Sequence, residues 1–589
     1  MTNRAIVPAI PTAMRTRKCA NVLLTLVIGA VTIGLGWAVL QTVPAPVQPL
    51  SKSIPSGAVL YLQARDFSSL LADWNKSPEK QRWLGSSNYQ VFSRSRLFLR
   101  LRDAGSQFAT AAGLPPDAKF LGQIAGSESA LALYDIGKIQ FLYITRLPST
   151  NSLQSQLWQT RSKFESRSAG GTTFYIRRTP DSEREVAFAI SGDYLLLSTR
   201  EDLMAGALQL LTGGSRHDAV ARSIESDPWW SQSVAAAGAA GDLRMVLNLE
   251  KIVPSPYFRS YWIQQNVSDM KQYTAAISDL YRSNQEYREE RVLLKRAADA
   301  VSSVDESGAV ADLVRLVPDN TGVYEARDCP SIESCFDPLQ TKLLAPHLVT
   351  TPAAPLAPQP QLTSGETGSS LDLETRIDQP PRQNASDSRS SALKQMLREN
   401  SVQAVLQVQS TERAADGVFV KVLSAVALAG GSAWSEAAAR SALANFVRPN
   451  LTTAELGVGW RPRNGYYELD GLETLVVAVR GRYLIVSDDS SLISAMLANM
   501  NRRVEARPAR FVAGFEHRRE RQHFLRFTSA VDRPDMSQQD NPGNARTPQF
   551  FSENIASLSS TLSGFSSEKI VVRSAGDNEL QTVTYKCSQ

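Results

Sequence analysis

The clearest hydrophobic pattern of the chain lies near its N-terminus. Residues Ala20–Leu40 are nearly all apolar, and no charged residue occurs between Lys18 and Lys52. A helix needs roughly 20 such residues to cross a hydrocarbon core of about 30 Å. The pattern predicts a transmembrane signal-anchor helix over residues 19–43, between a basic tail (1–18) and a Pro-rich spacer (44–50).

The charges around this segment predict its orientation. Arg4, Arg15, Arg17 and Lys18 all precede the apolar run. The positive-inside rule then leaves the N-terminus in the cytoplasm and exports the rest of the chain. A cleaved signal peptide is the alternative, with a weak cleavage site at Gly36-Trp37-Ala38.

Farther along, three pairs of segments match in the same order, which indicates an internal duplication. They are Ile54–Gly57 leading to Ala64–Asp66 against Val317–Asp319 leading to Ala326–Asp328, Gly192–Leu211 against Gly481–Met500, and Ile277–Lys295 against Ile555–Arg573. We therefore expect two related modules, residues 51–301 and 312–589, joined by a linker (302–311). The second module contains residues 346–390, which have seven prolines and few large apolar side chains and are expected to be disordered.

Alternating apolar positions within the matched segments predict antiparallel hairpins. Val186–Ile190 and Tyr194–Ser198 flank Gly192, and the second copy repeats the arrangement around Gly481. A helix is expected after each hairpin, and Ser198 with Glu201 fits a capping box. For Gln265–Val301 we expect a helix to about Ser283 and then a strand. The predicted class is α+β, with a transmembrane helix followed by two tandem modules of mostly antiparallel sheet with helices.

The composition and the absence of known motifs limit the kinds of partner, cofactor and active site that this chain is expected to have. The net charge of +5 over 589 residues is small for a nucleic-acid-binding protein, so no nucleic acid is expected as a partner. The chain has four cysteines and four histidines, too few for a disulfide-rich scaffold or a multi-cysteine zinc array. Phosphate-binding loops, dinucleotide-binding motifs and nucleophile elbows do not occur in it. No catalytic, cofactor-binding or metal-binding residue is predicted, and no cofactor is expected.

Four arginines are the weak candidates for binding an anionic ligand. Arg94, Arg96, Arg100 and Arg102 are interleaved with Phe92 and Leu97–Leu101. A strand would place all four on one side, where they could bind phosphate or sulfate groups. A helix would bury its apolar face and direct the arginines into water, and this interpretation is favoured.

Two further groups of polar residues have simple structural explanations. Asp488-Asp489 resembles a carboxylate pair, but it precedes an expected helix, where N-capping accounts for an Asp equally well. His517 and His523 are six residues apart, which places them on different faces of a helix.

The cysteines leave the disulfide question open. Asp328-Cys329-Pro330 looks like the start of a helix. Six residues of helix separate Cys329 from Cys335 by about 9 Å, beyond the roughly 7 Å limit for a disulfide. A bond requires this segment to be non-helical, or Cys587 to be the partner.

The N-terminal anchor, the Ile54–Gly57 to Tyr61 opening, the Ser129–Tyr134 strand and the Gly192–Leu195 hairpin resemble a bacterial family, domain of unknown function 3352. The resemblance covers most of the first copy and implies a bacterial envelope protein without known catalytic residues.

The favoured hypothesis is a single-pass protein of the bacterial inner membrane whose exported part is a binding or assembly module. Its partners would be the membrane, through residues 20–40, and an envelope protein or glycan. The alternative is an envelope hydrolase or transferase with an unrecognised catalytic site, so enzymatic activity is left open and the non-enzymatic interpretation is preferred.

Overall fold

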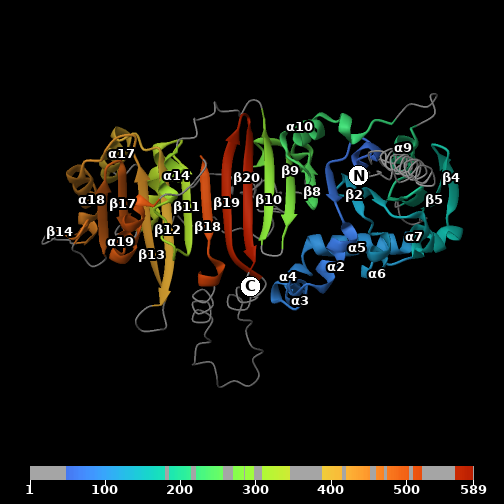
Figure 1. Cartoon of the computed structure of the whole chain (residues 1–589), viewed down its shortest axis with the longest axis horizontal. Coiled ribbons are helices and arrows are strands. Elements are labelled where there is room, and N and C mark those ends of the chain that lie inside the picture. Colours follow the sequence, from blue (N-terminus) through green and yellow to red (C-terminus); the bar gives the residue numbers. More distant parts are fainter. Residues whose placement is uncertain are drawn as a thin grey trace, which may run out of the picture.

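The computed structural model describes residues 48–178, 185–213, 221–255, 270–283, 286–296, 308–344, 388–413, 420–451, 459–469, 474–502, 508–520 and 564–587. Its strands form one antiparallel sheet that runs through both halves of the chain (Figure 1). The first-half strands are β1 Leu60–Ala64, β2 Glu128–Asp135, β3 Gln140–Arg146, β4 Glu165–Ala169, β5 Thr172–Arg178, β6 Glu185–Ser191, β7 Tyr194–Ser198, β8 Leu243–Leu247, β9 Tyr273–Arg282 and β10 Glu286–Lys295. The second-half strands are β11 Val323–Asp328, β12 Ala404–Arg413, β13 Val420–Ala429, β14 Trp460–Pro462, β15 Tyr467–Leu469, β16 Leu475–Arg480, β17 Tyr483–Ser487, β18 Phe511–Phe515, β19 Phe565–Ala575 and β20 Asn578–Cys587.

The strand order reads the same from both ends. From one edge it is β4-β5-β6-β7-β3-β2-β1-β8-β9-β10, and from the other edge β14-β15-β16-β17-β13-β12-β11-β18-β19-β20. The two series meet where β10 pairs with β20. Figure 1 shows these two strands at the centre of the molecule.

The pairing registers define which residues of the two halves correspond. Gly192–Leu211 and Gly481–Met500 lie on equivalent elements, each a hairpin followed by a helix. The other two sequence matches were partly wrong. The strand pairing places Ala64 at the position of Arg327, whereas the sequence match had paired it with Ala326, one residue earlier. Ile277–Lys295 corresponds to Lys569–Cys587, since β9–β10 is equivalent to β19–β20.

Helices cover both faces of the sheet in each half. On one face η1 (Leu50–Ser53), α9 (Glu201–Thr212) and α10 (Pro228–Ala236) pack on the first half, and α14 (Ala309–Val314) and α19 (Ser490–Ala498) on the second. On the other face lie α5 (Arg96–Ala112), α6 (Ala118–Ile124) and α8 (Gln156–Gln159) in the first half. Their counterparts in the second are α15 (Ile332–Leu339), η5 (Gln340–Leu344), α17 (Ser388–Glu399) and α18 (Glu436–Leu451).

Shorter helices complete the first half. Helices α2 (Phe67–Lys76), α3 (Pro78–Leu84) and α4 (Ser87–Phe92) lead from β1 to α5. The remaining ones are α7 (Ser149–Gln154), η2 (Thr160–Lys163), η3 (Ile224–Ser226) and α11 (Leu249–Ile252), and the second half adds η7 (Asn499–Asn501).

The α+β class and the antiparallel sheet agree with the sequence, but the predicted architecture is wrong. The halves are not tandem modules with sheets of their own, because β10 and β20 join them. Pairing these strands removes two exposed sheet edges, which is the physical reason for the continuous sheet. In the part of the chain that the structure describes, every helix is too short or too polar to span a bilayer. Residues 19–43 lie outside the described ranges, as do 346–387 of the expected disordered segment, while 388–390 begin α17.

Two local predictions are also wrong. The segment expected to be helical up to Ser283 forms strand β9. Its alternating positions Tyr273, Ala275, Ile277 and Asp279 are all buried, and the carboxylate of Asp279 is compensated by Arg244, whose Nε lies 2.7 Å from Oδ1. Ser198 does not cap helix α9; its hydroxyl instead accepts the N–H of Arg200 and donates to the carbonyl of Phe141.

Cys329 and Cys335 form a disulfide, with their Cα atoms 5.6 Å apart. The bond is possible because α15 begins only at Ile332, with Ser331 as its N-cap, so Cys329 is not helical. Of the two alternatives that the sequence left open, the non-helical segment is therefore the one realised.

Candidate ligand-binding site

An apolar pocket lies between the first-half sheet and the helices α5 and α6. Helix α5 begins after Ser95, whose hydroxyl accepts the N–H of Phe98, and ends at Gly113, which has φ 70°. Its positions Leu101, Ala104, Gly105 and Phe108 recur at helical spacing and therefore share one face, which faces the sheet.

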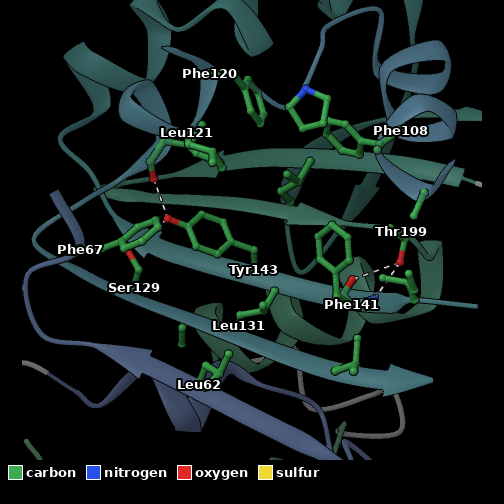
Figure 2. A pocket seen from close by; sticks show the side chains of 18 of the residues that line it. Leu62, Phe67, Phe108, Phe120, Leu121, Ser129, Leu131, Phe141, Tyr143 and Thr199 are labelled. Atoms are coloured by element: carbon green, nitrogen blue, oxygen red, sulfur yellow. Dashed lines mark hydrogen bonds between the residues drawn. The ribbon is translucent and has the colours of Figure 1, made fainter. Parts of the chain in front are cut away.

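The cavity measures about 480 Å³, within the range of small-molecule sites. The sheet contributes Leu62 from β1, Leu131 and Leu133 from β2, and Phe141 from β3, while α6 contributes Phe120 and Leu121. Figure 2 shows Leu62, Leu131 and Phe141 on the strands, and Phe120 and Leu121 on the helical side of the pocket. The lining is almost wholly hydrocarbon.

The few polar groups in the wall are bonded to the protein itself. The Tyr143 hydroxyl donates to the carbonyl of Ile124 at 2.7 Å, and Ser129 Oγ lies 2.6 Å from Thr145 Oγ1. Thr199 Oγ1 accepts the N–H of Phe141 at 2.8 Å (Figure 2). Burial raises the pKa of Tyr143, so its hydroxyl stays protonated. These groups leave the cavity without a strong partner for a polar ligand.

Glu185 is the one charged residue among those that line the pocket. Its Oε1 pairs with Arg178 Nε at 2.7 Å, and its Oε2 accepts the N–H of Glu201 at 3.0 Å. The carboxylate is thus engaged by an arginine and a helix N-terminus.

On the two strands equivalent to β1 and β2, several matching positions of the second half are polar. The register places Glu325 at the position of Leu62 and Arg327 at that of Ala64. Gln407 and Gln409 likewise take the positions of Leu131 and Leu133. Arg327 donates to the carbonyl of Ser334 in α15, which ties the sheet to the helix layer there. At these four positions the apolar lining therefore belongs to the first half alone, whereas Val426 and Val486, at the positions of Tyr143 and Leu197, keep the second half apolar.

Comparisons with known proteins add little. The chain matches no protein-family model and no curated protein sequence. Three crystal forms of TP0453 are similar to parts of it: form IV (13% identity, 42% of this chain, 81% of that chain), form I (14%, 42%, 79%) and form III (14%, 47%, 89%), each with a TM-score of 0.23. A likeness this weak carries no argument about fold or function.

The four predicted arginines lie on or just before helix α5. Arg96, Arg100 and Arg102 belong to α5 and Arg94 directly precedes it, so the favoured helical interpretation is confirmed. Arg94, Arg100 and Arg102 are exposed, and Arg100 Nε donates to the carbonyl of Gly137 at 3.2 Å. Their role in binding anions stays a prediction.

The other polar candidates lie far from the pocket along the sheet. Asp489 caps α19 by accepting the N–H groups of Ser491 and Leu492, as the capping interpretation requires. His517 Nε2 lies 3.7 Å from Glu568, and burial lowers its pKa. His523, the second histidine of that pair, lies outside the described ranges. Among the described residues no three His, Cys, Asp or Glu side chains are placed to hold a metal ion.

The sequence interpretation missed the pocket, although a signal was present. Strand β2 (ESALALYD) carries apolar residues on both faces, whereas its counterpart β12 has Gln407 and Gln409 on one face. Comparing the two copies position by position would have singled out Leu62, Leu131 and Leu133.

Proposed function

We propose that this protein binds a hydrophobic, chain-like ligand, such as a lipid acyl or isoprenoid chain, in the pocket of its first half. The observation that carries the proposal is the 480 Å³ cavity with an apolar wall, four of whose positions on β1 and β2 are polar at the matching places of the second half. The ligand would lie between β1–β3 and the helices α5 and α6.

The chemistry of the wall selects for such a ligand. A buried hydroxyl or amide without a hydrogen-bond partner loses free energy, and the polar atoms around this cavity are already paired. A glycan would bring many such groups, whereas a hydrocarbon brings none. Each methylene that leaves water for the pocket gains about 0.8 kcal/mol.

The proposal keeps the envelope location that the sequence predicts. Basic residues before Ala20–Leu40 support membrane attachment and export of the rest of the chain. The disulfide between Cys329 and Cys335 supports an oxidising compartment, because such bonds are rare in the cytosol. A membrane-attached protein of the bacterial envelope has lipids within reach, which suits an apolar pocket.

The test uses the full chain in bacterial membranes supplied with a photoactivatable fatty acid that carries a diazirine near its methyl end. After illumination, peptide mapping should place the label on segments that line the pocket, above all 101–121 and 131–143. Because Gly105 of α5 lines the cavity, substituting this residue provides a matched pair of variants.

Gly105→Phe should abolish the labelling, since its ring must occupy the cavity. Gly105→Ala should retain it, because a Cβ at this position meets nothing closer than Pro116 Cγ at 3.6 Å. Labelling that is spread evenly over the chain, or that survives Gly105→Phe in folded protein, would contradict the proposal.

A further inference from the structure

Large apolar side chains are exposed on the helices that lead from β1 into the pocket. Of the six such side chains that are exposed in the described part of the chain, four lie on α2, α3 and α5. They are Trp74, Leu84, Leu99 and Leu101, with exposed fractions of 49%, 46%, 42% and 49%. The other two, Leu153 and Val422, lie apart from them on α7 and β13.

The same segment is strongly basic. Residues 67–112 contain seven lysines and arginines and three aspartates and glutamates, a net charge of +4 within a chain of net charge +5. The arginines Arg94 and Arg102 are exposed beside Leu99 and Leu101 in sequence. Exposed apolar side chains interspersed with basic ones are typical of protein surfaces that contact anionic membranes.

This surface adjoins the pocket. Leu101 lines the cavity and is also half exposed, so it stands at the rim where the cavity meets the outer side of α5. Arg100 fixes this end of α5 to the turn between β2 and β3 through the carbonyl of Gly137. Figure 1 shows α2–α5 along one border of the first half, beside the ends of the strands.

We propose that α2–α5 dock on the surface of an anionic phospholipid bilayer and turn the rim of the pocket toward the membrane. Trp74, Leu84 and Leu99 would enter the region between headgroups and acyl chains, and the arginines would contact lipid phosphates. Only the purpose of docking rests on the proposed function. A docked pocket can exchange an acyl chain with the bilayer without exposing that chain to water. The docking itself stands on the exposed residues and their charge.

The experiment compares the full chain in vesicles that contain phosphatidylglycerol with the full chain in pure phosphatidylcholine vesicles. An environment-sensitive nitrobenzoxadiazole dye is attached at Leu84→Cys or Leu99→Cys, with Cys19 and Cys587 replaced by serine. Matched labels at Leu153→Cys and Val422→Cys serve as controls, because these positions are equally exposed and lie elsewhere.

The dyes at positions 84 and 99 should brighten several-fold in the anionic vesicles and be quenched by brominated acyl chains, and the control dyes should not. Arg94→Glu with Arg102→Glu, or high salt, should reverse the effect. Gly105→Phe should leave it intact, so that failure of the pocket and failure of docking are distinguishable. Equal signals in neutral and anionic vesicles, or a signal that requires a membrane protein extract, would overturn the proposal.

Discussion

At the scale of single residues, Thr199 and Asp488 occupy the same place in the two halves and differ in charge. Thr199 Oγ1 accepts the N–H of Phe141 at 2.8 Å, and Asp488 Oδ1 accepts the N–H of Ser424 at 2.7 Å. Burial raises the pKa of Asp488 to about 6, and the neighbouring Asp489 carboxylate adds to the effect. At neutral pH the second half therefore holds a carboxylate whose charge is disfavoured by burial, where the first half has a neutral hydroxyl.

The raised pKa of Asp488 determines how the free energy of unfolding changes with pH. The folded state binds a proton at Asp488 more tightly than the unfolded chain, whose Asp pKa is about 3.9, so this residue's contribution to stability falls as the pH rises from about 4 to 6. Asp488→Thr removes the charge and keeps the acceptor for Ser424. It should raise the free energy of unfolding at pH 7 by about 1–2 kcal/mol, allowing for partial exposure, and by almost nothing at pH 4.

Urea unfolding of the full chain at both pH values measures this difference. The reciprocal substitution Thr199→Asp should introduce the same pH dependence into the first half. An advantage of Asp488→Thr that is equal at pH 4 and pH 7 would show that burial does not disfavour the carboxylate.

At the scale of elements, the Cys329–Cys335 disulfide ties the end of β11 to α15. The six-residue separation closes a short loop, for which the loss of unfolded-state entropy is worth about 2 kcal/mol. The paired substitution Cys329→Ala and Cys335→Ala should lower the free energy of unfolding by about this amount. In urea unfolding, dithiothreitol should lower the stability of the natural chain and leave that of the variant unchanged. If dithiothreitol lowered the stability of both equally, it would be acting on a group other than this disulfide.

The sequence predicted elements best where local signals and burial agree. Glycines at positions 192 and 481, both with positive φ, mark hairpins that the structure confirms. The prediction failed at β9 because Asp279 occupies a buried position of the strand, and only its partner Arg244, on another strand, makes that burial tolerable. A pairing between distant residues cannot be read from the pattern of one segment.

The candidate site was hidden for a related reason. Leu62, Leu131 and Leu133 look like ordinary core residues, and only the placement of α5 away from part of the sheet leaves space above them. The four arginines were noticed because charge is visible in sequence, whereas a cavity is a property of packing. Ser198 and Ser487, at equivalent positions, form the same local bond, since each hydroxyl accepts the N–H two residues ahead, although Ser198 was expected to cap the helix.

At the scale of the whole molecule, the pairing of β10 with β20 makes one sheet from two halves. Nine residue pairs join these strands, from Glu286 with Lys586 to Leu294 with Asn578. Without them, each half would expose a ten-residue edge strand. Because backbone bonds continue across the junction, we expect both halves to unfold in a single cooperative transition.

Val583 lies at the centre of this junction and offers the test. It is 1% exposed and sits opposite Glu289 of β10 and Ile570 of β19, so its N–H bonds to one of these neighbours. Val583→Pro removes that bond and should cost about 2–4 kcal/mol. Thermal unfolding followed by circular dichroism should then show two transitions in place of one.

Val583→Ala, which keeps the N–H but loses the side-chain packing, should lower the melting temperature and retain a single transition. Two transitions already in the unaltered chain would mean that the halves are independent despite their shared sheet.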